Sequence, residues 1–376
     1  MDKKKPRLAA IEYIRGISML GVIGIHVGSV YILNPQSNLH LTALFEIFTR
    51  FSVPIFFFIS AFGLFYNLDL SAPFSYGKFL RRRFQAVLVP YVVWSLFYVT
   101  HDTLTQGNAF PSLGDLASLL FFGNAKYQLY FLVILIWFYL LMPLWIAIVR
   151  RIGGKGLALL FLGQVALNMF IDSATFFLYV DGMADDYWLK PFLVYRLNYW
   201  VLPYAFVFIL GGWLSVHHDR FQNFMQRKGL TIQLAFATTL AALLGYYYYL
   251  IEIDGYSQLE AIFTAHQLSP PGIFYTVAAS VFFFRLFTYG RFAPLTHELL
   301  SMLGHHSYFV YLVHPVFITY LTYLLSEQGI IITAPLAIAF YLTVLCLSLA
   351  TAAIARRLGE KIPLINLATI GAKPKR

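Results

Sequence analysis

Runs of roughly 18 or more mostly apolar residues recur along this chain, and they constrain its fold more than any other feature. A run of that length crosses the hydrocarbon core of a bilayer as one α-helix. Candidate spans are residues 9–33, 42–67, 85–102, 128–149, 156–172, 196–216, 229–251, 271–290, 306–326 and 332–355. With 59% hydrophobic and 12% charged residues, one soluble core could not hide this surface. The sequence predicts an all-α, polytopic membrane bundle of about ten transmembrane helices.

The distribution of Lys and Arg predicts the orientation of these helices. Basic residues cluster at the N-terminus, in the connections around 78–83, 150–155 and 220–228, and in the C-terminal tail. The intervening connections, 34–41, 103–127, 173–195, 252–270 and 327–331, hold almost none beyond Lys126 and Lys190. The positive-inside bias places both termini in the cytoplasm, which requires an even number of spans. This topology also accounts for the net charge of +10, so no nucleic-acid partner is expected.

The chain shows no sign of an appended soluble domain, and residues 1–376 are predicted to form one integral-membrane domain. The N-terminal apolar run contains Glu12 and Arg15 and lacks a small-residue cleavage site, which argues against a signal peptide. Cys346 is the sole cysteine and falls inside the last span, so neither a disulfide framework nor a thiolate metal site is expected.

Arg15 and His26 are two titratable residues inside the first span. They project from nearly the same helix face, about 16 Å apart along the axis, Arg15 in the inner half and His26 in the outer half. A neutral imidazole suits general-base chemistry, whereas an arginine stays charged and needs a partner, either Glu12 or an anionic ligand. The alternative is that each residue only fixes packing within the bundle.

The second span carries Arg50 in its outer part and Ser60 and Gly63 in its inner part. Pro54 is expected to kink this helix and to free backbone carbonyls. Ser60 and Gly63 could border a cavity or could serve close helix packing. Two further arginines, Arg196 and Arg285, could each pair with Glu46 or Glu252.

Two more segments are candidates for chemistry. Lys78, Arg81, Arg82 and Arg83 form a basic cluster at the inner mouth of the third span, typical of a topogenic stop and equally suited to holding phosphates. The ninth span places Ser307, Tyr308, Tyr311 and His314 along one polar stripe. His314 could be a structural or a catalytic histidine, and His305 and His306 fit an interfacial position.

These segments together resemble membrane acyltransferase family 3, the polytopic O-acyltransferases that modify bacterial surface polysaccharides. The resemblance covers nearly the whole chain. It is carried by GluTyrIleArgGly at 12–16 with His26, by ValProIlePhePhePheIleSerAlaPheGly at 53–63, and by PheLeuArgArgArg with ValProTyrValValTrpSer at 79–95. TyrGlnLeuTyrPheLeu at 127–132 and SerTyrPheValTyrLeuValHisPro at 307–315 are also similar to family segments.

The chain departs from the family pattern at two places. Ala61 stands where the family usually has glycine. The family's basic motif spaces two arginines three apart, whereas Arg83 is followed three residues later by Ala86, and only Lys78 with Arg81 restores that spacing. The sequence therefore leaves open which guanidinium contacts the donor.

The resemblance implies an acyl-coenzyme A donor, with acetyl the expected group, that reaches the protein from the cytoplasm. It implies a glycan or lipid-linked glycan acceptor on the outer side, and the inner membrane of a bacterium as the location. In this scheme Arg81 to Arg83 hold the nucleotide, Arg15 lines the donor's channel and His26 deprotonates the acceptor hydroxyl. No metal and no permanently bound cofactor are expected.

A membrane transporter or exporter of an anionic metabolite or polysaccharide is the alternative from another functional class. Such a protein would use the same charged and kinked helices without making a bond. Secondary transporters often contain paired halves with matching broken helices. Since the sequence shows no such repeat, the enzyme interpretation is preferred.

Overall fold

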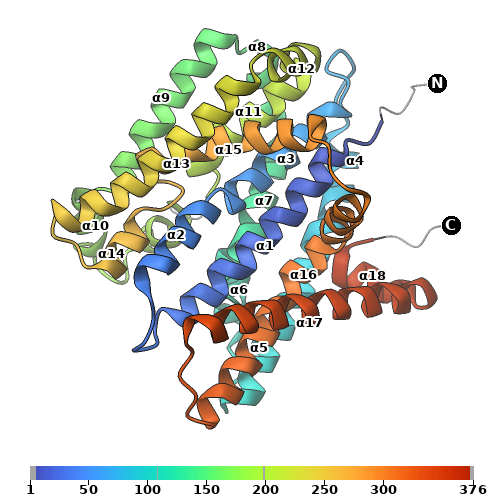
Figure 1. The fold of residues 1–376 in the computed structure, drawn as a ribbon. Coiled ribbons are helices and arrows are strands. Elements are labelled where there is room, and N and C mark those ends of the chain that lie inside the picture. The colour runs from blue at the N-terminus through green and yellow to red at the C-terminus, as the bar shows by residue number, and fades with distance from the viewer. Residues whose placement is uncertain (1–5, 108, 198–199, 373–376) are drawn as a thin grey trace. The chain divides into compact units, whose positions relative to one another are not determined.

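In the computed structural model, residues 6–107, 109–197 and 200–372 are described, and every regular element within these ranges is a helix (Figure 1). The predicted all-α membrane fold is therefore confirmed. Contacts divide the chain into two compact units. Unit 1 comprises Met1–Leu68 with Val207–Ala352, and unit 2 comprises Asp69–Phe206 with Ala353–Arg376.

Most of the predicted spans correspond to long helices. Among the described residues, eight helices are long and apolar enough to cross a membrane, or nine if a bent pair is counted as one span. That pair, Tyr130–Leu140 and Met142–Arg151, bends by 64° within the predicted span 128–149. The predicted span 196–216 corresponds to a shorter apolar segment, Leu202–Val216.

Unit 1 contains the helices of the first two spans and most of those of the last five. They are α1 (Ala9–Tyr31), α2 (Leu39–Thr49), α3 (Ser52–Tyr66), most of α11 (Ala205–Val216), α12 (His218–Arg227), α13 (Gly229–Glu252), α14 (Gln258–Thr264), α15 (Pro270–Tyr289), α16 (Pro294–Glu327) and most of α17 (Ala334–Lys361). The central element is α1, which contacts α2, α3, α15 and α16.

Small residues set the register of α1 against its neighbours. A Cβ at Gly16 would lie 3.1 Å from the Gly304 nitrogen, and one at Gly304 would lie 2.1 Å from the Glu12 carbonyl oxygen, so α1 and α16 touch backbone to backbone. His26 contacts His314, and since this pair and the Gly16–Gly304 pair are both 288 positions apart, the two helices run parallel. On another face, a Cβ at Gly21 would lie 2.1 Å from Ser52 Oγ at the start of α3.

The connections of unit 1 gather at two ends, as the alternation of basic and non-basic connections predicts. At the end expected outside, His40 contacts Gln258 at 3.0 Å, and Ile332 N donates to Asn34 Oδ1 at 3.1 Å. At the end expected inside, the Tyr13 hydroxyl lies 3.0 Å from His297 Nδ1. The assignment of these ends to the two sides of the membrane stays a prediction.

Unit 2 contains the helices between these two parts of unit 1 and the end of the chain. They are α4 (Tyr76–Arg83), the π-helical turn η1 (Phe84–Leu88), α5 (Val89–Gln106), α6 (Leu113–Phe122), α7 (Tyr130–Leu140), α8 (Met142–Arg151), α9 (Gly154–Ile171), α10 (Ala174–Asp181), a second π-helical segment η2 (Phe192–Leu197), the 3₁₀ turn η3 (Leu202–Tyr204) and α18 (Pro363–Ile370).

Side-chain caps start several helices in the connections expected outside. Asn38 accepts from Leu41 N at the start of α2, and Ser269 caps α15 ahead of Pro270. Ser257 and Glu260 form a reciprocal capping box at α14. Because the first N–H groups of a helix have no partner within it, such caps locate helix starts where apolar length alone does not.

Candidate functional site

The His26 and His314 side chains meet between α1 and α16. His26 Nδ1 lies 2.8 Å from His314 Nε2, and the planes of the two rings are nearly parallel, with an interplanar angle of 6°. His314 is fully buried, whereas His26 is partly exposed. The structure thus joins the two intramembrane histidines that the sequence singled out separately.

The neighbours of this pair determine which nitrogens carry protons in the neutral state. His314 Nδ1 lies 3.1 Å from the Val310 carbonyl oxygen, which can only accept, so Nδ1 carries the proton. His314 Nε2 then has the lone pair and accepts from His26 Nδ1–H. Consequently the lone pair of neutral His26 lies on Nε2, the form that a general base requires.

Pro315 follows His314 within α16 and alters the helix there. Proline has no N–H, so the Tyr311 carbonyl lacks its usual backbone donor four residues later. Tyr311 is buried, and its ring lies 6.2 Å from the His314 ring. The HisPro sequence therefore places a polar side chain at a point where the helix ladder is interrupted.

The other residues of the α16 stripe separate into two environments. Ser307 is buried and donates to the Gly304 carbonyl at 2.8 Å, which places it in the backbone contact with α1. Tyr308 is partly exposed. Ser307 thus belongs to helix packing, whereas the Tyr311 ring contacts the His314 ring.

Arg15 lies on α1 with an exposed side chain. The carboxylate that the sequence offered as its partner, Glu12, forms an ion pair with Arg7 at 3.1 Å. Glu12 Oε2 is therefore paired with Arg7 Nη2.

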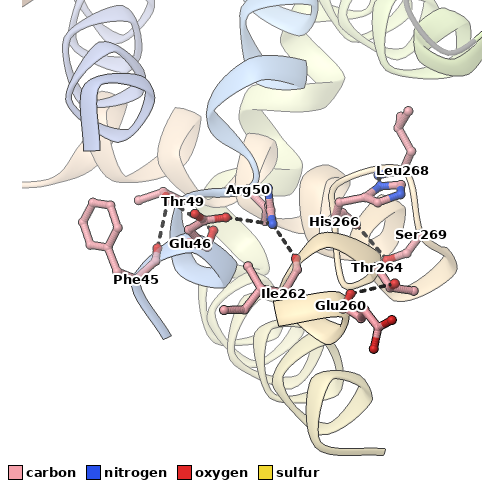
Figure 2. A network of polar contacts seen from close by, with 10 residues as sticks. All are labelled: Phe45, Glu46, Thr49, Arg50, Glu260, Ile262, Thr264, His266, Leu268 and Ser269. Carbon is pink, nitrogen blue, oxygen red and sulfur yellow. Dashed lines mark hydrogen bonds and ion pairs between the residues drawn. The ribbon is translucent and has the colours of Figure 1, made fainter. Parts of the chain in front are cut away.

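Arg50 and Glu46 form a second polar centre, on α2 and at its end (Figure 2). Arg50 Nη2 lies 2.9 Å from Glu46 Oε2 and donates to the Ile262 carbonyl of α14 at 2.6 Å. The side chains are only 10% and 4% exposed. A Cβ at Gly28 would lie 3.5 Å from Glu46 Oε1, so this ion pair packs against α1 at Gly28, two residues after His26.

The second span differs in detail from its prediction. The helix is interrupted at Arg50 and Phe51, where Pro54 removes the backbone donor to the Arg50 carbonyl, yet Leu39–Tyr66 remains one apolar span. A Cβ at Gly63 would meet nothing closer than Ile11 Cδ1 at 3.8 Å, so this glycine is not required for close packing. Ser60 is partly buried.

Glu46, one of the two carboxylates that the sequence offered to Arg196 and Arg285, forms an ion pair with Arg50, four residues later on the same span. Arg285 instead donates from Nε to the Met225 carbonyl at 2.9 Å. The side chain of Arg196 lies outside the described residues. A carboxylate and an arginine four residues apart are the signal that identifies the Glu46–Arg50 pair from sequence.

The basic cluster lies on α4, and its four cations are not equivalent. Lys78, Arg81 and Arg82 are exposed and share one helix face, because they are three and four residues apart. Arg83 turns away, with its guanidinium carbon 5.6 Å from the Phe79 ring and 5.8 Å from the Tyr139 ring. Two cation–π contacts thus hold Arg83 in the helix interface.

The other end of the same span carries a polar cluster that the sequence reasoning missed. His101 Nδ1 lies 2.9 Å from Asp102 Oδ1, and Lys126 Nζ lies 2.9 Å from Asp102 Oδ2 and 5.5 Å from the Tyr98 ring centre. The signal available in the sequence was an acidic residue ending an apolar span, followed by an outer connection with Lys126 as its one basic residue.

The connection that contains α14 holds its own charges in place. Ser257 donates from its backbone N–H and its hydroxyl to Glu260, and these two bonds keep the pKa of that carboxyl below its ordinary value. His266 Nδ1 accepts from Leu268 N at 3.0 Å, and Ser269 donates to the His266 carbonyl (Figure 2). With Arg50 bound to Ile262, this segment is fixed at several points over α2.

This chain is similar to one protein family and to several known bacterial proteins. The family model described as "Acyltransferase domain" matches residues 8–357. Three relatives from Staphylococcus aureus strains MRSA252, MSSA476 and MW2 are each named "Probable poly-beta-1,6-N-acetyl-D-glucosamine export protein". Each is 21% identical over 322 residues, covering 83% of this chain and 83% of the relative. No solved structure matches the chain.

The family match agrees with the helical architecture and with the positions of the motifs on it. It extends from the residue before α1 to the last part of α17, so it includes both histidines and the basic cluster. The protein is therefore a multi-pass membrane member of acyltransferase family 3.

Proposed function

We propose that this protein transfers an acyl group, acetyl as the first choice, from acyl-coenzyme A to a hydroxyl of a cell-surface or exported glycan. The observation that carries the proposal is the hydrogen bond between His26 and His314, which sets the lone pair of His26 on Nε2. The family match supports acyl transfer as the reaction class.

In the proposed reaction, His26 Nε2 takes the proton of the acceptor hydroxyl as its oxygen attacks the thioester carbonyl carbon. The tetrahedral intermediate then collapses, the carbon–sulfur bond breaks, and His26 returns the proton to the departing sulfur. The products are an O-acyl ester and free coenzyme A, with the base restored. The positive charge that forms on His26 spreads toward His314, whose Nδ1 is held by the Val310 carbonyl.

The proposed donor site is the exposed face of Lys78, Arg81 and Arg82 on α4. Three cations on one face suit the phosphates of coenzyme A, and Arg83 is assigned to anchoring α4 because its guanidinium contacts two aromatic rings. Arg15, exposed on α1, is assigned to guiding the donor. In the predicted orientation all four lie toward the cytoplasm, where coenzyme A is available.

The acceptor is proposed to be a polymer of amino sugars. This inference rests on the relatives, whose names refer to poly-beta-1,6-N-acetyl-D-glucosamine. Its free hydroxyls are acyl acceptors of the kind that the mechanism requires.

Purified protein in detergent, given radiolabelled acetyl-coenzyme A and an oligomer of β-1,6-linked N-acetylglucosamine, tests the proposal. We expect label to appear on the oligomer in an alkali-labile ester, and we expect Arg81→Gln with Arg82→Gln to raise the Kd for coenzyme A. Arg151→Gln, an exposed arginine at the end of α8, is the matched charge control. Transfer that proceeds equally with His26→Ala would reject the general-base assignment.

Export of the polymer is the second candidate function, favoured by the names of the relatives. An exporter would move the oligomer across a bilayer without forming an ester. Proteoliposomes loaded with fluorescent oligomer distinguish the two functions. Efflux that needs no acyl-coenzyme A and that persists with His26→Ala would favour export over the enzyme.

A further inference from the structure

The C-terminal helix α18 packs against the span that follows the basic cluster. It lies beyond residue 357, where the family match ends. At its C-terminus Gly371 has φ +64°, in the left-handed region that favours glycine, and a Cβ there would lie 2.4 Å from both Ala86 Cα and the Gln85 carbonyl oxygen. Two residues earlier, in α18, the Thr369 carbonyl accepts from Trp94 Nε1 at 3.2 Å.

These two contacts lie at and after the π-helical turn Phe84–Leu88. Such a turn contains an extra residue, and one extra residue rotates the preceding helix by about 100° relative to the following one. The direction of the cationic face of α4 relative to α5 therefore depends on this turn. Ala86 lies inside the turn and Trp94 lies about 12 Å further along the axis, so α18 contacts both the turn and the regular helix beyond it.

The opposite side of α4 is fixed independently. The Tyr76 hydroxyl donates to the Leu140 carbonyl of α7 at 2.7 Å, and Arg83 stacks on Phe79 and Tyr139. These contacts hold α4 against α7, which also packs against the π-helical turn. At Gly371 the backbone approaches Ala86 so closely that no side chain larger than hydrogen fits.

We propose that α18 and Gly371 are positioning elements of the donor site, which hold the π-helical turn and thereby direct Lys78, Arg81 and Arg82 toward the phosphates of coenzyme A. The inference rests on the proposed function of that face. π-helical turns in helices frequently occur at functional sites, and α18 contacts this one through the backbone of Gly371. The positioning acts on the donor and leaves the acceptor chemistry at His26 unaffected.

Gly371→Ala tests the contact, and Gly107→Ala is its matched control. Gly107 has φ +70° in the same unit but meets no atom within 4 Å, so both variants introduce the same backbone strain and only one closes on the turn. Two further variants are Trp94→Phe, which removes the bond to Thr369, and truncation after Ile362, compared with truncation after Ala372. The measurements are the Kd for coenzyme A by calorimetry and the KM for each substrate.

We expect Gly371→Ala and truncation after Ile362 to raise the coenzyme A Kd and the donor KM about tenfold or more, since misplacing a binding group by roughly 1 Å can cost up to about 100-fold. Trp94→Phe should raise both by about fivefold, one lost hydrogen bond. The kcat at saturating donor and the acceptor KM should stay at the wild-type values, as should all constants of Gly107→Ala and of truncation after Ala372.

The positioning role would be overturned if Gly371→Ala and Gly107→Ala bound coenzyme A with equal affinity and truncation after Ile362 left that affinity unchanged. If Arg81→Gln with Arg82→Gln still weakens coenzyme A binding in that case, the proposed donor site survives without α18. Failure of the wild-type protein to bind coenzyme A would reject the donor site itself, and the positioning role with it.

Discussion

Removal of His26 and removal of His314 should have effects of different size, because the two rings occupy different places in one hydrogen-bonded chain. His26→Ala removes the proposed base, which contributes about 100- to 10,000-fold to kcat in enzymes of known mechanism. His314→Leu removes one neutral hydrogen bond of 2.8 Å, worth about 1 kcal/mol and hence about fivefold in the population of the active tautomer. We therefore expect a large loss in the first variant and a small loss in the second.

A double variant makes the reasoning sharper. Once His26 is absent, His314 has no imidazole to orient, so His26→Ala with His314→Leu should be no slower than His26→Ala alone. His314→Gln should recover most of the wild-type rate, because the Gln carbonyl oxygen can accept from His26 Nδ1. His305→Leu, at an exposed position on the same helix, controls for loss of a histidine in general.

The assay is the initial rate of ester formation from radiolabelled acetyl-coenzyme A at saturating donor, normalised to monodisperse protein by fluorescence-detected size-exclusion chromatography. Two outcomes would refute the reasoning. A loss in His314→Leu as large as that in His26→Ala would make His314 the base. A rate loss in the double variant equal to the product of the two single-variant losses would show that the residues act independently.

The remaining predictions concern stability, measured as the thermal midpoint in detergent. Arg50→Met should lower the free energy of unfolding by about 3–5 kcal/mol, because it leaves the buried Glu46 carboxylate without its cation. Glu46→Leu with Arg50→Met should lower it by less, and a larger loss in the double variant would contradict this prediction. Gly304→Ala should lower the thermal midpoint, since its Cβ would lie 2.1 Å from a backbone oxygen. Gly63→Ala should leave the midpoint unchanged within error, since the nearest atom to its Cβ is 3.8 Å away. Equal losses in the two variants would contradict the close contact between α1 and α16. Glu260→Gln should be less stable than wild type at neutral pH, and the difference should vanish as the pH falls through the lowered pKa of this carboxyl. A difference that grows in acid would contradict this.

Local features of the chain were enough to predict a bundle of long membrane helices, whereas the direction of each span stays a prediction. Apolar length decides whether a segment can cross a bilayer, and basic connections decide its direction, so both are readable without knowing any contact. The exceptions arise where local chemistry is ambiguous. Predicted span 128–149 is a pair of helices bent by 64°, and the interruption near Pro54 falls at Arg50 and Phe51.

In the candidate site too, features within one helix could be predicted from the sequence, whereas contacts between helices could not. The spacing of Arg15 and His26, and the face shared by Lys78, Arg81 and Arg82, follow from 3.6 residues per turn and were available from the sequence. Helix periodicity identifies the polar face of a segment but does not identify the helix that this face meets.

Only the tertiary structure decided the partners. It paired His26 with a histidine 288 positions away, Arg50 with the carbonyl of Ile262, and the backbone of Gly371 with Ala86. Each contact depends on the register between two helices, which is set by backbone approach at small residues such as Gly16 and Gly304. The sequence by itself thus determined a membrane helix bundle with a candidate base, and packing between distant helices determined the tautomer and the supports that the chemistry requires.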